Sequence, residues 1–195
     1  MLIREYESSD EKGWVRCRTL SFLETAYFDD VLREKEKYEN PAIELVAVIE
    51  NQIVGIIDVE YELEEKTVCS TGKGLGGMIW HVAVHPDFQR LRVGAKLLYE
   101  AERIALDKGL NRLEVWTRDD EWVNQWYLKN KFIKVNSYFH VYIEGRQAVR
   151  RIMQSDSREL KPVRVFAHYT GKDVSDIKNQ FNRVHECICY EKNLV

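Results

Sequence analysis

The chain has 195 residues, of which 45% are hydrophobic and 31% charged, and its formal net charge at pH 7 is −3. This length and composition fit one domain with a buried core. The slight acidic excess argues against a nucleic-acid-binding protein, and no run of about 18 apolar residues is present to cross a membrane.

Strands and helices are mixed along the first half of the sequence. In chain order, hydrophobic periodicity and turn signals predict a strand at 2–6, helices at 8–22 and 31–38, a hairpin of strands at 43–49 and 53–62, a polar loop at 62–77 and a strand at 78–84.

The second half continues this mixture. It predicts a helix that ends at Gly109, a strand at 113–117, a helix capped by Asp119 or Asp120, a strand at 132–143, a basic stretch of helix and loop at 145–163, a helix at 174–184 and a strand at 185–191. Helices and strands around one core predict a single α/β domain of three layers over 1–195, in which 145–184 is an insertion before the last strand. The passage from 78 to 117 should form a right-handed parallel crossover.

The four cysteines, Cys17, Cys69, Cys187 and Cys189, have no metal-site spacing. Cys187 and Cys189 alternate along a predicted strand and therefore point to one face. We expect reduced, packed thiols in a cytoplasmic protein without a bound metal, and a disulfide or metal site is the less favoured alternative. The amino terminus has no secretory signal pattern, which agrees with this location.

Residues 72–77, Gly-Lys-Gly-Leu-Gly-Gly, match the GxGxxG pattern of dinucleotide-binding proteins literally. That fingerprint requires a strand before it and a helix after it, whereas here a polar stretch precedes and a strand follows. We favour a flexible loop, and a nucleotide site is the less favoured alternative.

A loop at 89–95 joins the apolar strand at 78–84 to an amphipathic helix. The first turn of a helix leaves backbone N–H groups unpaired and carries partial positive charge, and Arg90 and Arg92 add full charges. This combination predicts an anion site that suits a diphosphate. The alternative is an ordinary turn with two solvated arginines.

Residues 89–94, Gln-Arg-Leu-Arg-Val-Gly, and the preceding Val-Ala-Val-His-Pro at 82–86 resemble the acetyl-CoA-binding motif of the GNAT superfamily of N-acetyltransferases, Gln/Arg-x-x-Gly-x-Gly/Ala. The chain departs from the motif at Arg92, where the family usually has Gly. Because a positive φ is costly for Arg, we expect position 92 to be helical or the loop to be slightly reshaped.

Residues 120–132 resemble a later motif of the same family, Asn…Tyr-x-Lys-x-Gly-Phe. Tyr127, Lys129 and Phe132 agree with it, whereas Asp120 and Lys131 replace its Asn and Gly. A Tyr on an apolar helix face is more often part of a core. At this position the resemblance implies that Tyr127 donates a proton to the departing CoA thiolate.

The resemblance implies a three-layer α-β-α acyl-CoA N-acyltransferase fold with a mixed central sheet that splays beside Val84. It implies acetyl-CoA as co-substrate, no metal, and direct attack by a primary amine in a ternary complex, with the backbone N–H of Val82 as oxyanion donor. The residues that it places at the CoA are Val82, Ala83, Val84, Gln89, Arg90, Leu91, Arg92, Val93, Gly94, Ala95 and Asn124.

Three residues are candidates for the base. Glu114 lies in a Leu-Glu-Val segment similar to that of the ribosomal-protein N-terminal acetyltransferases, where the Glu is the base. His81 stands next to the expected oxyanion donor and has a free pKa near neutrality, although a core or surface histidine is the simpler interpretation. Glu60, on the hairpin, is the third candidate, and a solvated carboxylate is its alternative.

The resemblance implies that the acceptor is a small-molecule amine or a peptide N-terminus. A group of acidic residues either attracts a cationic amine or is simply a solvated charged loop: Glu60, Glu62, Glu64, Glu65, Asp119 and Asp120. The segment 145–184, with Arg146, Arg150, Arg151 and Arg158, either covers the acceptor site or forms a homodimer contact. The alternative function is an acyl-CoA-binding module without turnover, because Arg92 and the base are both atypical.

Overall fold

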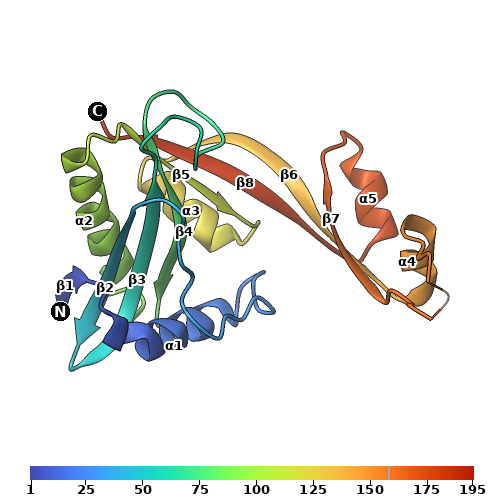
Figure 1. The fold of residues 1–195 in the computed structure, drawn as a ribbon, viewed down its shortest axis with the longest axis horizontal. Coiled ribbons are helices and arrows are strands. Elements are labelled where there is room, and N and C mark those ends of the chain that lie inside the picture. Colours follow the sequence, from blue (N-terminus) through green and yellow to red (C-terminus); the bar gives the residue numbers. More distant parts are fainter. Residues whose placement is uncertain (158) are drawn as a thin grey trace. The chain divides into compact units, whose positions relative to one another are not determined.

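The computed structural model describes residues 1–157 and 159–195, so Arg158 of the basic segment lies outside the described residues. The described strands form a mixed sheet in the order β1-β2-β3-β4-β5-β8-β6-β7 (Figure 1). The strands are β1 Leu2–Glu5, β2 Ala42–Ile49, β3 Gln52–Tyr61, β4 Gly76–Val84, β5 Arg112–Thr117, β6 Ile133–Glu144, β7 Arg164–Tyr169 and β8 Arg183–Asn193. The helices are α1 Glu11–Phe22, α2 Val93–Asp107, α3 Glu121–Lys129, α4 Arg146–Ile152 and α5 Val174–Gln180, with short 3₁₀ turns at Ser8–Asp10 and Pro86–Phe88.

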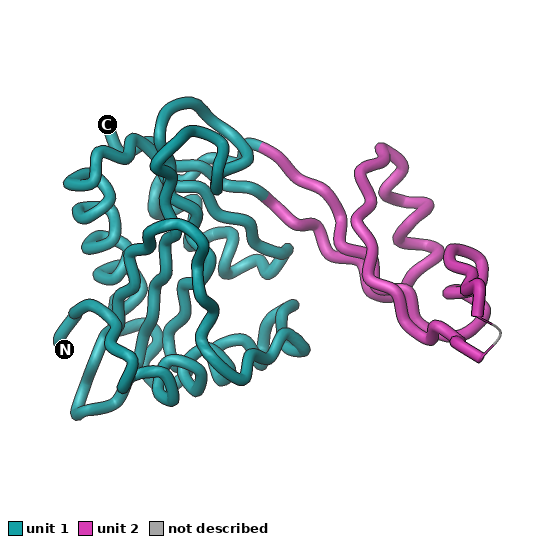
Figure 2. Tube along the Cα trace, viewed as in Figure 1, with its two compact units in different colours: residues 1–135, 189–195 teal, residues 136–188 magenta. Residues whose placement is uncertain are grey.

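The chain divides into two compact units, 1–135 with 189–195 and 136–188 (Figure 2). In the first unit, α1 and α2 cover opposite faces of the sheet. Ile56 packs with Trp14 of α1, whereas a side chain at the adjacent Gly55 would meet Val93 and Leu97 of α2. Neighbouring residues of a strand point to opposite faces, so two layers of helix enclose the strands. The three-layer α/β fold predicted from the sequence is confirmed.

The second unit has its own small core. Val141 and Ile143 of β6 and Val149 of α4 are buried there against apolar side chains of β7 and α5. The single domain with an insertion at 145–184, and the function of that segment, stay predictions. Strand β7 was not predicted, although Val165, Ala167 and Tyr169 alternate with polar or exposed residues along it.

The helix predicted at 31–38 is wrong, because these residues are irregular. Several of their polar groups bind distant strands. Lys35 pairs with Glu44 and Asp58, and the Tyr38 hydroxyl donates to Asp58 at 2.8 Å. Residues 31–40 are called the strap below. The strap is held by long-range partners that no local pattern reveals.

Strand β4 positions the site because β5 pairs with only its first part, whereas β3 follows it to Val84. It pairs in parallel with β5 from Gly76 to Ile79, which confirms the predicted parallel connection, but no paired residue follows Ile79 on that side. On the other side a bulge skips Trp80, since His81 pairs with Asp58 and Ile79 with Val59. The last residues of β4 are therefore open toward β5, as a splayed sheet requires.

Candidate functional site

The loop from Gln89 to Ala95, called the anion loop below, turns sharply between β4 and α2. Arg90 and Arg92 have positive φ angles of 63° and 61°. Arg92 directly precedes α2, and no described side chain caps the helix there. The N–H groups of the first helical turn are thus left for an external acceptor, and the helix start adds partial positive charge.

Side chains of the anion loop mostly face solvent. Gln89, Arg90, Leu91, Arg92 and Ala95 are exposed, Gly94 is half-buried and Val93 is buried. The loop is seated on the open end of β4, because the Gln89 amide donates to the carbonyl of Val84 at 3.4 Å. A Cβ at Gly94 would lie 3.4 Å from the Val84 side chain, so the helix start contacts the splay directly. Ala83 itself is buried, which leaves only its backbone for a ligand.

The expectation that Arg92 is helical is wrong, and the alternative of a slightly reshaped loop stays a prediction. Arg92 adopts the left-handed conformation, with φ 61° and ψ 19°, that glycine adopts without steric cost. For an L-residue this conformation costs roughly 1–2 kcal/mol. Backbone strain therefore accompanies the guanidinium at this position.

We expect the free energy of unfolding of the Arg92→Gly variant to be about 1 kcal/mol higher than that of the Arg92→Ala variant. Both variants lose the guanidinium, but only glycine adopts a positive φ without steric cost. Urea denaturation of the two variants measures the difference. Arg103, exposed inside α2, is the control. At that position the glycine variant should have a free energy of unfolding about 1 kcal/mol lower than the alanine variant. The same order at both positions would contradict the strain at Arg92.

Tyr127 of α3 lies in a cluster of aromatic rings. Its side chain is buried, and the ring stacks on Tyr190 with centroids 5.7 Å apart. Burial raises the pKa of the hydroxyl above the usual value for tyrosine. The hydroxyl is therefore protonated at working pH, as a proton donor must be.

Asn124, on the same helix, is engaged within the protein. Its amide nitrogen donates to the carbonyls of Arg118 and Asp120 at 2.8 Å, and its oxygen accepts from the Tyr190 hydroxyl at 2.8 Å. Asn124 thereby ties α3 to the end of β8, and its contact with CoA stays a prediction. Asp120 precedes α3 as predicted, but its carboxylate accepts from the backbone N–H of Ala26 at 3.0 Å.

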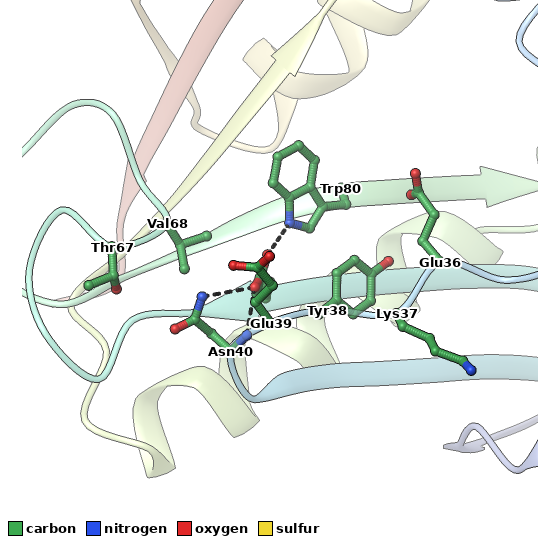
Figure 3. A pocket seen from close by; sticks show the side chains of 9 residues that line it. Glu36, Lys37, Tyr38, Glu39, Asn40, Thr67, Val68 and Trp80 are labelled. Carbon is green, nitrogen blue, oxygen red and sulfur yellow. Dashed lines mark hydrogen bonds between the residues drawn. The ribbon is translucent and has the colours of Figure 1, made fainter.

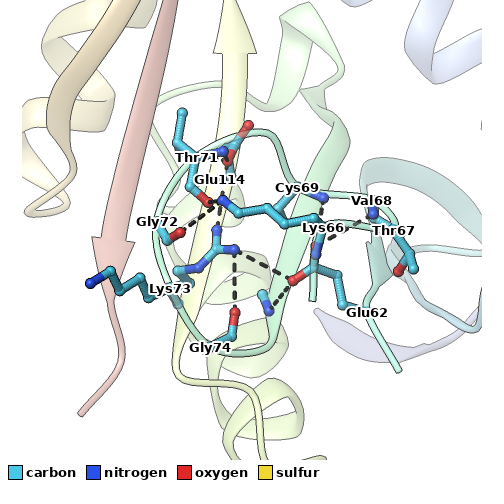
Figure 4. Close-up of polar contacts among 12 residues, drawn as sticks. Glu62, Lys66, Thr67, Val68, Cys69, Thr71, Gly72, Lys73, Gly74 and Glu114 are labelled. Carbon is cyan, nitrogen blue, oxygen red and sulfur yellow. Dashed lines mark hydrogen bonds and ion pairs between the residues drawn. The ribbon is translucent and has the colours of Figure 1, made fainter. Parts of the chain in front are cut away.

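Glu114 anchors the loop 62–75 from β5 (Figure 4). Its carboxylate accepts from the backbone N–H and hydroxyl of both Ser70 and Thr71, and from the Trp116 indole at 3.0 Å. Burial raises the pKa of Glu114, but the hydrogen bonds from Ser70 and Thr71 outweigh it and lower that pKa to about 2. This carboxylate is thus poorly suited to accept a proton near neutral pH.

Glu62 supports the same loop at its start, directly after β3. Its carboxylate accepts from the backbone N–H groups of Lys66, Cys69 and Gly76 at 2.8–3.0 Å, and it lies 3.4 Å from the Arg112 guanidinium. The Gly-rich stretch at 72–77 therefore runs from a loop tied to the strands by carboxylates into the start of β4. A strand and not a helix follows it, which does not suit a dinucleotide site.

His81 is buried on β4 between two charged partners. Its Nδ1 accepts from Nε of Arg18 at 3.4 Å, and its Nε2 lies 2.5 Å from the Glu36 carboxylate. Because Arg only donates, the ring carries its proton on Nε2 and donates a hydrogen bond from there to the Glu36 carboxylate. Glu36 lies in the strap, so the mistaken helix at 31–38 concealed its proximity to β4.

A pocket of about 420 Å³ opens between the strap, β3, β4 and the loop 62–75 (Figure 3). Its lining residues are Glu36, Lys37, Tyr38, Glu39, Asn40, Glu60, Thr67, Val68 and Trp80. Of the six acidic residues predicted to gather at the acceptor, only Glu60 lines it. Glu62 and Asp120 are committed to the backbone bonds described above, and sequence analysis missed Glu36 and Glu39.

All four cysteines are free and at most 2% exposed, so the predicted packed thiols are confirmed. Burial raises the pKa of Cys17 and of Cys69 to about 12. Among the described residues, no cluster of three or more His, Cys, Asp or Glu is arranged to hold a metal ion. In the same part of the chain, no helix is long and apolar enough to cross a membrane.

Residues 7–132 match the model of the Acetyltransferase (GNAT) family. No curated protein matches the sequence. Solved structures with the same fold include the ribosomal-protein-S18-alanine N-acetyltransferase from Escherichia coli, with a TM-score of 0.57 and 11% identity over 99% of this chain and 93% of that one. The PaiA N-acetyltransferase from Thermoplasma acidophilum, in complex with coenzyme A, has a TM-score of 0.55 and 17% identity over 69% and 90% of the two chains. A GNAT family acetyltransferase from Elizabethkingia anophelis with acetyl-CoA bound has a TM-score of 0.52 and 13% identity over 98% and 97%.

Proposed function

Since the chain belongs to the GNAT family of acetyltransferases, we propose that it moves an acetyl group from acetyl-CoA to a primary amine by direct attack in a ternary complex. The observation that carries this proposal is the anion loop. Arg90 and Arg92 flank a tight curl that opens onto the uncapped start of α2, beside the splayed end of β4. The two structures solved with coenzyme A or acetyl-CoA share this fold and support the same ligand.

Backbone N–H groups of the anion loop and the two guanidiniums fit a diphosphate, which needs several donors and positive charge at one spot. The described pairing of β4 with β5 ends before Val82, so the backbone from Val82 to Val84 is proposed to bind an extended chain such as pantetheine on that side. The N–H of Val82 is proposed to stabilise the oxyanion, and Tyr127 to protonate the leaving thiolate. We also propose that the protein acts in the cytoplasm, as a monomer or as a homodimer.

For the amine proton, the geometry favours the hydrogen-bonded pair of His81 and Glu36, in which the bond from His81 lowers the pKa of Glu36. Glu114 is saturated by donors, and Glu60 already accepts from Asn40 and Trp80. Glu36 lines the pocket, and its bond to His81 fixes it beside the residue that precedes Val82. His81 would then act through Glu36, by orienting it.

The variant that combines Arg90→Ala and Arg92→Gly should bind CoA at least about tenfold more weakly, because a hydrogen bond to a charged group contributes roughly 1.5–3 kcal/mol. Glycine at 92 preserves the backbone conformation, so the loss reports on charge. Isothermal titration calorimetry with CoA measures the dissociation constant.

Arg103→Ala, which removes a charge from the exposed part of α2, is the control and should bind CoA as the wild type does. An unchanged dissociation constant in the double variant would refute the anion loop as the CoA site. Firm binding by the wild type without acetylation of any amine in a broad panel would favour a CoA-binding module instead.

A further inference from the structure

The pocket lined by the strap contains more acidic than basic side chains. Glu36, Glu39 and Glu60 line it, and Lys37 is the only basic residue among its lining residues. A ligand with a carboxylate would find one flexible ammonium and three repelling groups. A ligand with positive charge would be attracted by the three carboxylates and repelled only by the one ammonium.

Glu60 is the fixed carboxylate of the pocket. It is 7% exposed and accepts from the backbone and side chain of Asn40 and from the Trp80 indole at 2.8–3.0 Å. Burial raises its pKa, but the hydrogen bonds outweigh burial and leave that pKa below the usual value. Glu60 therefore remains charged and keeps its position near neutral pH.

Trp80 gives the pocket an aromatic wall. It sits on the bulge of β4 and is 49% exposed, and its N–H bond to Glu60 holds the indole beside that carboxylate (Figure 3). Indole is the best aromatic partner for an organic cation. An ammonium group could thus contact a carboxylate and an aromatic face in the same place.

The two ends of the pocket lie near different parts of β4. Glu36 is bonded to His81, next to the proposed oxyanion donor Val82, whereas Glu60 is bonded to Trp80. Trp80 and Val82 are two residues apart across the bulge, which is at most about 7 Å along the chain. The two nitrogens of an extended four-carbon diamine are about 6 Å apart by standard bond lengths. One amine can therefore lie at the Glu36 end while a second reaches Trp80.

We propose that the acceptor is a short-chain diamine or a longer polyamine, whose second ammonium is held by Glu60, Glu39 and the Trp80 indole. This inference rests on the proposed acetyl transfer and names its substrate class. Amino acids that carry a carboxylate at the distal position are disfavoured, because the same three groups repel it.

Three amines that differ only at the far end of a four-carbon chain test the proposal: 1,4-diaminobutane, butylamine and 4-aminobutyrate. We expect kcat/KM for acetylation to fall in that order, by about tenfold between the first two, since an aromatic face and a carboxylate both attract the second ammonium. Calorimetric binding of the same amines should give the same order. Equal kcat/KM for the diamine and butylamine, or a preference for 4-aminobutyrate, would overturn the proposal.

Variants locate the preference in the pocket. Glu39→Gln and Trp80→Leu change exposed side chains, and each should reduce the preference for the diamine over butylamine about fivefold with CoA affinity unchanged. Glu50→Gln removes the same charge at the distant turn between β2 and β3 and should keep the preference. A preference that survives in both pocket variants would place the second ammonium elsewhere.

The two proposals fail in distinguishable ways. Acetylation of all three amines at equal rates would refute the diamine site and leave acetyl transfer intact. Absence of acetylation would refute the proposed function, while calorimetry would still decide whether the pocket selects the diamine.

Discussion

Tyr127→Phe should lower kcat by about 10²–10⁴-fold, the usual range for loss of a general acid, and leave the dissociation constant for CoA nearly unchanged. The ring remains stacked on Tyr190, so the free energy of unfolding should change by less than about 1 kcal/mol. Steady-state kinetics and urea denaturation measure the two effects. Because burial raises the pKa of Tyr127, wild-type kcat should not fall as pH rises through about 10, where a free tyrosine ionises.

Tyr190→Phe is the matched control, since it removes the same hydroxyl from the other ring of the stack. That hydroxyl donates to Asn124, so its loss should cost about 1 kcal/mol of stability with kcat within severalfold of wild type. If both variants lost activity equally, the aromatic cluster would matter only as structure. If Tyr127→Phe kept full kcat, Tyr127 would have no part in the chemistry.

Lys35→Met should lower the free energy of unfolding by about 3–5 kcal/mol, because it leaves a buried carboxylate without its cation. Lys35 is 6% exposed, and its Nζ lies 2.8 Å from the fully buried Asp58. Asp58 also accepts from the Tyr38 hydroxyl at 2.8 Å and from the Trp14 indole at 3.4 Å. Chemical denaturation measures the loss.

Removing both charges should cost less than removing one. The double variant Lys35→Met, Asp58→Asn should recover part of the loss, since the uncompensated charge is gone and the amide still bonds to Tyr38 and Trp14. Arg103→Ala, which breaks an exposed pair with Glu100, should cost less than about 1 kcal/mol. A loss of that small size for Lys35→Met would mean that the strap contributes little to the fold.

Local patterns were sufficient to predict most elements of the first unit. The hairpin of β2 and β3 follows from two β-rich runs around Glu50 and Asn51, both of which have positive φ. Helix α2 follows from its apolar stripe and from Gly109, which has φ 82° as a helix terminator requires. These features depend on neighbours within a few residues.

Features set by distant partners were not accessible from the sequence. The strap carries helix-like signals, but the buried ion pair of Lys35 and Asp58 and the bond from Glu36 to His81 determine its path. A resemblance drew attention to Glu114, yet most of its hydrogen bonds come from Ser70 and Thr71, more than 40 residues earlier. The left-handed backbone of Arg92 likewise contradicts the local preference of Arg, and the surrounding loop determines it.

The buried thiols have a practical consequence for the assays above. Acetyl transfer releases free CoA, whose thiol reacts with chromogenic disulfide reagents such as Ellman's reagent. Such a reagent needs an accessible thiolate, whereas each cysteine of the folded chain is at most 2% exposed, and burial holds the pKa of Cys17, Cys69 and Cys189 far above neutrality. The native enzyme should therefore contribute almost no background colour, and turnover can be followed continuously with every cysteine left in place.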